Sequence, residues 1–221
     1  MTPPDIVLDE LERDALTELV NIGVSRAAAG LRKMVGEEIL LSVPAVEVVD
    51  HRTAAALIEE REGDELIAVK QDFSGAFQGR ALLIFPHAKS LDLVRAVVGA
   101  EMPVAELLEI QQEALAETGN VILNSCLAAM ANMLRQSVKM SLPEVIAGGG
   151  RALLASDASD PSDPEGLVLF LYINFFVRDR SIRGYIAMVM DLPSLAALKL
   201  LVGDFIARVM GDDIGQSAIP P

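Results

Sequence analysis

Two short segments of the sequence carry a glutamate and an asparagine at the same spacing. Glu18 and Asn21 lie in TELVNIG, and Glu117 and Asn120 lie in AETGNVI. Both segments belong to apolar runs that predict helices, although an asparagine in a helix costs about 0.5 kcal/mol relative to alanine. Asparagine is a hydrogen-bonding group rather than a nucleophile. The pairs therefore suit the positioning of a water molecule for attack on a group that is activated elsewhere.

Each pair is part of a longer polar row on its predicted helix. At 3.6 residues per turn, the members of one row fall within about 60° of one another. The rest of the second helix is apolar almost all round, which indicates a helix wrapped by protein with one strip left open. Gly119 is expected to mark a close approach of backbone or ligand. The first polar ridge is Asp14, Glu18, Asn21 and Ser25, and the second polar ridge is Glu113, Glu117, Asn120 and Asn124.

Other interpretations of these residues are weaker. A single Glu-x-x-Asn pair would ordinarily be a solvated helix face, but such a face has no reason to repeat the same two residues. His51 and His87 have no counterparts in the other half of the chain, so neither predicts a shared acid–base or metal site. A pair of carboxylates could suggest a glycosidase, but Asp14 and Glu18 lie one turn apart on one helix rather than across a cleft.

The polar ridges belong to a pattern that covers most of the chain. The segment 90–99, SLDLVRAVVG, matches SLAALKLLVG at 194–203. Agreement in the same order throughout predicts one internally duplicated domain over 1–211, with repeats at about 8–102 and 104–211 and a disordered tail at 212–221. Asp14, Glu18, Asn21 and Pro44 recur 99 residues later as Glu113, Glu117, Asn120 and Pro143.

Each repeat predicts the same succession of elements. A long helix (9–34 and 104–137) precedes a strand that carries the shared proline. Two β-rich runs follow (65–74 with 78–86, and 166–178 with 182–191), and a second helix closes the repeat (87–99 and 192–210). Strands in adjacent pairs favour an α+β fold in which long helices pack on a largely antiparallel β-sheet. The polar segment 156–166 predicts a loop.

Composition limits the possible partners. The formal net charge of −14 disfavours binding to nucleic acid or to an anionic membrane. The most apolar segment, 166–177, is too short to cross a bilayer, and the acidic N-terminus lacks the apolar core of a signal peptide. Cys126 is the only cysteine, so it predicts a buried thiol and excludes an intrachain disulfide. We therefore expect a cytoplasmic protein without membrane insertion.

The repeated motif resembles that of the CheC/CheX/FliY family of chemotaxis phosphatases. The family pattern is Asp or Ser, three residues, Glu, two residues, Asn, then twenty-two residues and Pro, and the first half of the chain matches every position. The second half departs at Glu113. Relatives tend to have glycine before the asparagine, where this chain has Val20 in its first half. We expect Val20 to narrow access to Asn21, so that Asn120 belongs to the better site.

The resemblance implies dephosphorylation of a phosphorylated CheY-type response-regulator receiver. Asn21 and Asn120 would orient the attacking water, and Glu18 and Glu117 would dock the lysine of the receiver. Asp14 and Glu113 would support that docking, whereas Pro44 and Pro143 would shape the strands. The chain itself would bind no metal, since Mg²⁺ comes with the receiver.

The resemblance leaves two further expectations. A CheD-like deamidase is a possible second partner, and the alternative function is a non-catalytic receiver-binding or flagellar-switch-like module of the same fold. Both the receiver site and this chain are acidic, so basic residues near the ridges would have to offset repulsion. The candidates are Arg13, Arg26, Arg32, Lys33, Arg135 and Lys139.

Overall fold

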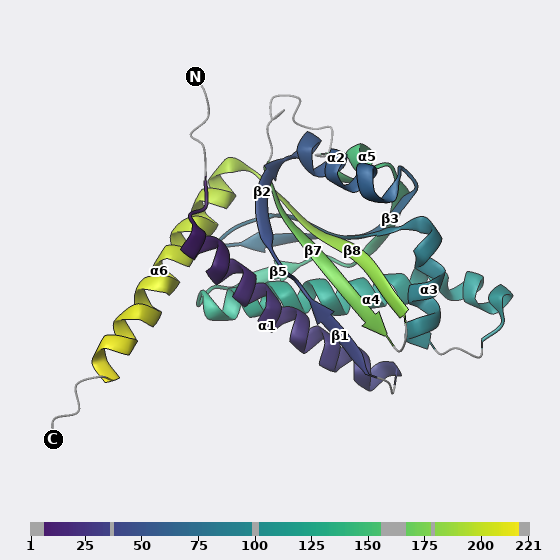
Figure 1. The fold of residues 1–221 in the computed structure, drawn as a ribbon, viewed down its shortest axis with the longest axis horizontal. Coiled ribbons are helices and arrows are strands. Elements are labelled where there is room, and N and C mark those ends of the chain that lie inside the picture. Colours follow the sequence, from purple (N-terminus) through teal and green to yellow (C-terminus); the bar gives the residue numbers. More distant parts are fainter. Residues whose placement is uncertain (1–6, 36–37, 99–101, 156–166, 178–179, 217–221) are drawn as a thin grey trace.

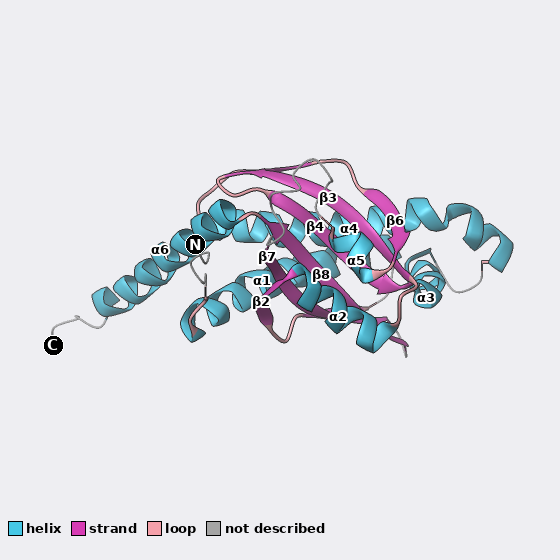
Figure 2. Cartoon of the chain, turned by 90° about the horizontal axis from the view of Figure 1, so that it is seen from above, coloured by secondary structure: helices cyan, strands magenta, loops and turns pink. Residues whose placement is uncertain are grey.

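The computed structural model describes residues 7–35, 38–98, 102–155, 167–177 and 180–216. Helices pack on one β-sheet, and the C-terminal part of α6 extends away from the rest of the molecule (Figure 1, Figure 2). The elements are α1 (Glu10–Val35), β1 (Ile39–Ser42), β2 (Val46–Asp50), α2 (His51–Glu62), β3 (Leu66–Gly75), β4 (Gly79–Pro86), α3 (His87–Val98), α4 (Val104–Met133), β5 (Val138–Met140), β6 (Glu144–Gly148), α5 (Gly150–Leu154), β7 (Leu167–Val177), β8 (Arg180–Met190) and α6 (Leu192–Gln216).

The predicted α+β fold is confirmed, and every pairing within the described sheet is antiparallel. The order helix, two strands, helix, two strands, helix occurs from α1 to α3 and again from α4 to α6. A duplicated domain would give this order, although the duplication itself stays a prediction. Among the described helices, none combines the length and apolar content needed to span a membrane.

Three details of the predicted elements were wrong. The strand expected around each proline is two strands, β1 with β2 and β5 with β6. The helices α2 and α5 were not predicted. The helix α6 continues to Gln216, whereas a disordered tail was expected from residue 212. The loop predicted at 156–166 and the end of the tail, 217–221, lie outside the described residues.

The two halves of the chain exchange strands within the sheet. The central pair is β4 with β8, while β1 and β2 from the first half pair with β7, and β5 and β6 from the second half pair with β3. Between β1 and β2, the three residues 43–45 face only two residues of β7, 172–173. Between β5 and β6, the three residues 141–143 face only two residues of β3, 71–72. Each of these segments is a β-bulge, with three residues opposite two. Each of these β-bulges contains one of the repeated prolines, which cannot donate a backbone hydrogen bond to the ladder.

Alternating side chains of the sheet enter two separate apolar cores. In β4, Leu83 belongs to the large core beneath α1 and α4. The next residue along the chain, Ile84, belongs to the smaller core that also contains Ile58 of α2 and Leu153 of α5. The helices α2 and α5 are therefore present because the second face of the sheet is apolar and must be covered.

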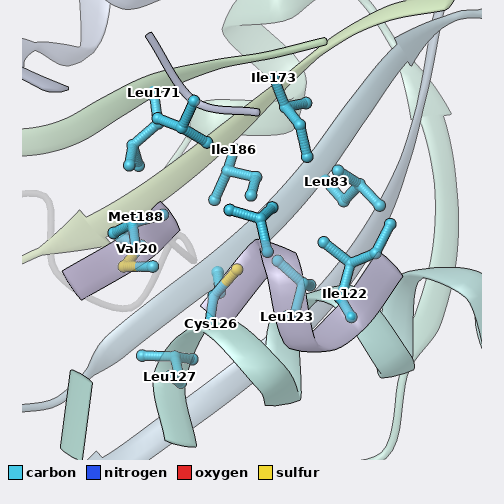
Figure 3. Packing of buried hydrophobic residues seen from close by; sticks show 14 of the residues in the cluster. Val20, Leu83, Ile122, Leu123, Cys126, Leu127, Leu171, Ile173, Ile186 and Met188 are labelled. Carbon is cyan, nitrogen blue, oxygen red and sulfur yellow. The ribbon is translucent and has the colours of Figure 1, made fainter. Parts of the chain in front are cut away.

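The helices α1 and α4 pack closely and antiparallel. A Cβ atom added to Gly23 would lie 2.5 Å from the Cα of Cys126, and one added to Gly30 would lie 3.5 Å from Val121. Figure 3 shows Cys126 among the apolar side chains of the core. The pKa of this fully buried thiol is raised by desolvation from 9.0 to about 12. The predicted buried thiol is confirmed, and Gly23 permits the contact between the helices.

Candidate functional site

The first polar ridge lies along the solvent side of α1. Asp14, Glu18 and Ser25 are exposed, whereas Asn21 is half-buried. A hollow of about 420 Å³ opens on this part of the helix. Its walls are Glu18, Asn21, Ile22, Ser25, Arg26 and Ala29.

The amide of Asn21 is bound to the backbone of Val43, in the bulge between β1 and β2. Its Nδ2 donates to the Val43 carbonyl at 2.8 Å, and its Oδ1 accepts from the Val43 N–H at 2.9 Å. The bulge interrupts the ladder, so the backbone of the buried Val43 would otherwise lack partners. Pro44 follows directly, and Asn21 thus joins α1 to the interrupted strand.

The second polar ridge lies along α4 and holds its asparagine differently. Glu113 and Glu117 are exposed, whereas Asn120 and Asn124 are half-buried. The Oδ1 atom of Asn120 accepts hydrogen bonds from Nδ2 of Asn124 and, at 3.1 Å, from Nε2 of Gln71 in β3. No described residue accepts a hydrogen bond from Nδ2 of Asn120, so this group is available to an incoming molecule.

The two bulges also differ in the burial of the apolar residue that precedes the proline. Val43 is 1% exposed and belongs to the core, whereas Leu142, which precedes Pro143, is 86% exposed. In the second bulge the carbonyl of Ser141 accepts a hydrogen bond of 2.9 Å from Nε2 of Gln71. The backbone of the second bulge is therefore bound through Gln71 rather than directly by the ridge asparagine.

The expectation that Val20 narrows access to Asn21 was wrong, whereas the close approach expected at Gly119 is present and is made by the strand β3. Val20 is fully buried in the large apolar core, whose residues Figure 3 shows, so it does not crowd Asn21. A Cβ atom on Gly119 would lie 2.5 Å from the Val69 side chain of β3. Gly119 therefore allows α4 to approach the sheet, and it does not open a ligand site.

Basic residues do lie beside the first ridge. Arg26 lines the hollow that contains Glu18 and Asn21. Arg32 and Lys33 line an adjoining hollow of about 730 Å³ between α1 and β1. At the other ridge, Arg135 and Lys139 are exposed just beyond α4 and on β5. Arg13 is also exposed, and its Nε donates to the Leu8 carbonyl at 3.1 Å.

The described residues contain no group of three or more His, Cys, Asp or Glu side chains that could hold a metal ion. His51 begins α2 and His87 begins α3, so neither histidine lies on the two helices that carry the polar ridges. The chemistry available at the ridges is that of carboxylates, amides and the cations beside them. Such groups can orient water and bind a cation, but among the described ridge residues none is a nucleophile backed by a base.

Sequence and structure comparisons find the same group of chemotaxis proteins. A family model described as "Chemotaxis phosphatase CheX" matches residues 67–162. The flagellar motor switch phosphatase FliY of Bacillus subtilis (strain 168) is 24% identical over 140 residues, which are 62% of this chain but only 36% of that protein. The CheY-P phosphatase CheC of the same organism is 24% identical over 143 residues, which are 62% of this chain and 67% of CheC.

The solved structure of Thermotoga maritima FliY has the same fold. Its TM-score is 0.69 at 20% sequence identity, and the match covers 90% of this chain and 100% of that one. Over these ranges the chain is similar to members of the CheC/CheX/FliY group of chemotaxis proteins.

The part of the chain that matches the family model contains the second ridge. Residues 67–162 include Glu117, Asn120 and Pro143, whereas the first ridge on α1 lies before them. The roles given to the ridge residues stay proposals. The structure adds that each asparagine is half-buried beside an exposed glutamate, so both can be reached from solvent.

One residue that contacts the second ridge was missed from the sequence. Gln71 is 1% exposed and contacts Asn120, yet it lies in a β-rich run that we predicted only as a strand. The sequence did carry a signal for Gln71. Alternate residues of β3 face the core, and the other three in this row are the apolar Ile67, Val69 and Phe73. A glutamine in such a row requires a buried hydrogen-bond partner.

Proposed function

We propose that this chain is a phosphatase that removes the phosphoryl group from the aspartyl phosphate of a CheY-type receiver. Two relatives support the substrate class, since they are named a CheY-P phosphatase and a flagellar motor switch phosphatase. The observation that carries the proposal is the arrangement on α1 and α4, where an exposed glutamate lies three residues before a half-buried asparagine on both helices. We further propose a cytoplasmic location.

The ridge residues divide the work between docking and water positioning. Glu18 and Glu117 make no hydrogen bond or ion pair with another described residue, so each is free to bind a cation such as the lysine of a receiver. Asp14 and Glu113 lie one turn earlier and add negative charge. The asparagine amides then fix a water molecule in line with the phosphorus, which is sufficient because phosphoryl transfer depends mainly on positioning and charge stabilisation.

The divalent metal belongs to the receiver in this scheme. Carboxylates of the receiver hold Mg²⁺ beside the phosphoryl group, and this chain contributes no ligand. We expect the purified chain to contain no stoichiometric metal, and its phosphatase activity to vanish when EDTA removes Mg²⁺ from the mixture. A metal ion that stays bound to the purified chain after treatment with EDTA would contradict the assignment of the metal to the receiver.

The decisive experiment measures phosphate release from a phosphorylated CheY-type receiver, with and without the purified chain. We expect faster loss of phosphate with the wild-type chain and no acceleration with the variant carrying both Asn21→Ala and Asn120→Ala. Binding of the phosphorylated receiver without faster phosphate loss would instead show the alternative, a non-catalytic receiver-binding module. A CheD-like deamidase would be tested separately as a binding partner.

A further inference from the structure

Gln71 connects the sheet to the second polar ridge through a buried hydrogen-bond network. Its Nε2 donates to Oδ1 of Asn120 at 3.1 Å and to the carbonyl of Ser141 at 2.9 Å. The side chain is 1% exposed, so it cannot touch a docked partner. Its effect on any reaction at the ridge must therefore act through Asn120.

The first ridge has no such residue. Each bulge faces one inward-pointing residue of the opposite strand, which is Gln71 in β3 and Ile173 in β7. Beside Ile173, the amide of Asn21 bonds the Val43 backbone directly. Beside Gln71, the amide of Asn120 bonds the glutamine, which in turn bonds the bulge. The same strand position therefore decides how each asparagine is held.

We propose that Gln71 is a positioning residue, which fixes the amide of Asn120 so that its Nδ2 group faces the reacting water. The inference rests on the proposed phosphatase function. An amide side chain can rotate by half a turn and exchange its oxygen and nitrogen. Donors from Gln71 and Asn124 both reach Oδ1, so the network selects one of these two orientations.

A purely structural role does not explain Gln71 well. Its Oε1 is buried and has no partner among the described residues, which is a costly arrangement for a strand facing an apolar core. An aliphatic residue would avoid this cost, as Ile173 does at the corresponding position. The glutamine therefore serves the orientation of Asn120 at some expense of stability.

The test uses Gln71→Met, an unbranched apolar replacement of similar length. It is made in two backgrounds, each of which leaves only one ridge active. In the Asn21→Ala background, where only the second ridge works, we expect kcat for receiver dephosphorylation to fall about tenfold or more with KM unchanged. In the Asn120→Ala background, the same substitution should leave the rate of the first ridge unaltered. Equal losses in both backgrounds, or an unchanged kcat in the first, would overturn the proposal.

A matched control removes a different glutamine side-chain contact, one that joins α4 to α3. Gln111→Met deletes the bond from Nε2 of Gln111 to Oγ of Ser90, 2.7 Å long, and should leave both rates unchanged. If Gln71→Met does not fold, Gln71→Leu is the second variant, with the same expected loss of kcat.

A second readout is independent of phosphatase activity. The Nδ2 protons of Asn120, assigned by their loss in Asn120→Ala, should give sharp and distinct NMR signals in the wild-type chain. Gln71→Met should broaden or merge them and leave those of Asn21 unchanged. Absence of phosphatase activity in every variant would defeat the proposed function alone, whereas unaltered Asn120 signals would defeat the role of Gln71.

Discussion

The side chain of Asn21 and the backbone of Val43 form a closed pair of hydrogen bonds, 2.8 and 2.9 Å long, between α1 and the first bulge. Asn120 makes no such bond to Leu142, which occupies the corresponding place in the second bulge. One asparagine therefore stabilises a strand, while the other is held by side chains. The two ridges share residue types and spacing but differ in what their asparagines must do for the fold.

The first prediction concerns the stability contributed by Asn21. Asn21→Ala should lower the free energy of unfolding by about 1–3 kcal/mol, because it leaves the buried N–H and carbonyl of Val43 without partners. The gain in helix propensity, about 0.5 kcal/mol, is too small to compensate. Urea unfolding monitored by circular dichroism measures the change. Ser25→Ala, at an exposed position of the same ridge, is the control and should be nearly neutral.

The second prediction concerns Asn120 and the share of activity at each ridge. Asn120→Ala should remove the larger part of receiver dephosphorylation, because Nδ2 of Asn120 is available whereas the amide of Asn21 is engaged by Val43. The melting temperature should change little, since the Nε2 group of Gln71 keeps its bond to Ser141. This reason replaces the crowding by Val20 that the sequence suggested.

The rates of the two ridges should also add, since no described contact couples the asparagines. The losses in the two single variants should then sum to the loss in the double variant. A double variant with nearly wild-type activity would show that the asparagines are not the catalytic groups and that the ridges are ordinary helix surfaces.

The third prediction tests the role of Gly119. Gly119→Ala should destabilise the fold by about 1–3 kcal/mol, because the new methyl group would lie 2.5 Å from Val69. Gly203→Ala, in α6 where a Cβ meets nothing within 4 Å, should instead be neutral or stabilising. Equal effects at both glycines would contradict the packing explanation.

The elements that could be predicted were those with a regular spacing of apolar residues, or with two β-rich runs next to each other in the sequence. Both long helices, the paired strands of each half and the antiparallel sheet followed from local patterns. The helix α2 did carry a start signal, since Asp50 accepts hydrogen bonds from the backbone of Arg52 and Thr53. Its charged end, EERE, hides the apolar residues by which α2 packs on the sheet. The short α5 begins at the last of three consecutive glycines and is ordered by the apolar face it covers.

The contacts of the asparagines could not be predicted in the same way. Asn21 meets Val43 and Asn120 meets Gln71 only because helices and strands pack in one particular register. A spacing along the sequence identifies the ridge, but it does not say which strand residue lies beneath. The difference between Gln71 and Ile173 is visible in the sequence, and its meaning appears only once the two bulges are aligned.

The fourth prediction concerns pH. Burial raises the pKa of the Cys126 thiol to about 12, above its ordinary value of 9.0. The unfolded chain therefore loses this proton at a lower pH than the folded chain does. Below pH 9.0 the thiol is protonated in both states, and its contribution to the free energy of unfolding is fully present. As the pH rises from 9.0 towards about 12, the free energy of unfolding falls by at most about 1.4 kcal/mol per pH unit.

Denaturant unfolding at several pH values above 9.0 measures this effect. Cys126→Ala, which removes the titrating group, should have a flatter pH dependence than the wild-type chain. Parallel curves for the two proteins would show that another group, such as the buried Tyr185, is responsible.

The exchange of strands between the two halves has a consequence for how the chain reaches its native state. Residues 66–75 are completed by β5 and β6 of the second half, and residues 167–177 by β1 and β2 of the first. A fragment containing either half alone would present a long unpaired edge beside an uncovered helix. Each half therefore acts as a template for the other, and separately expressed halves should recover their secondary structure only by complementation when mixed.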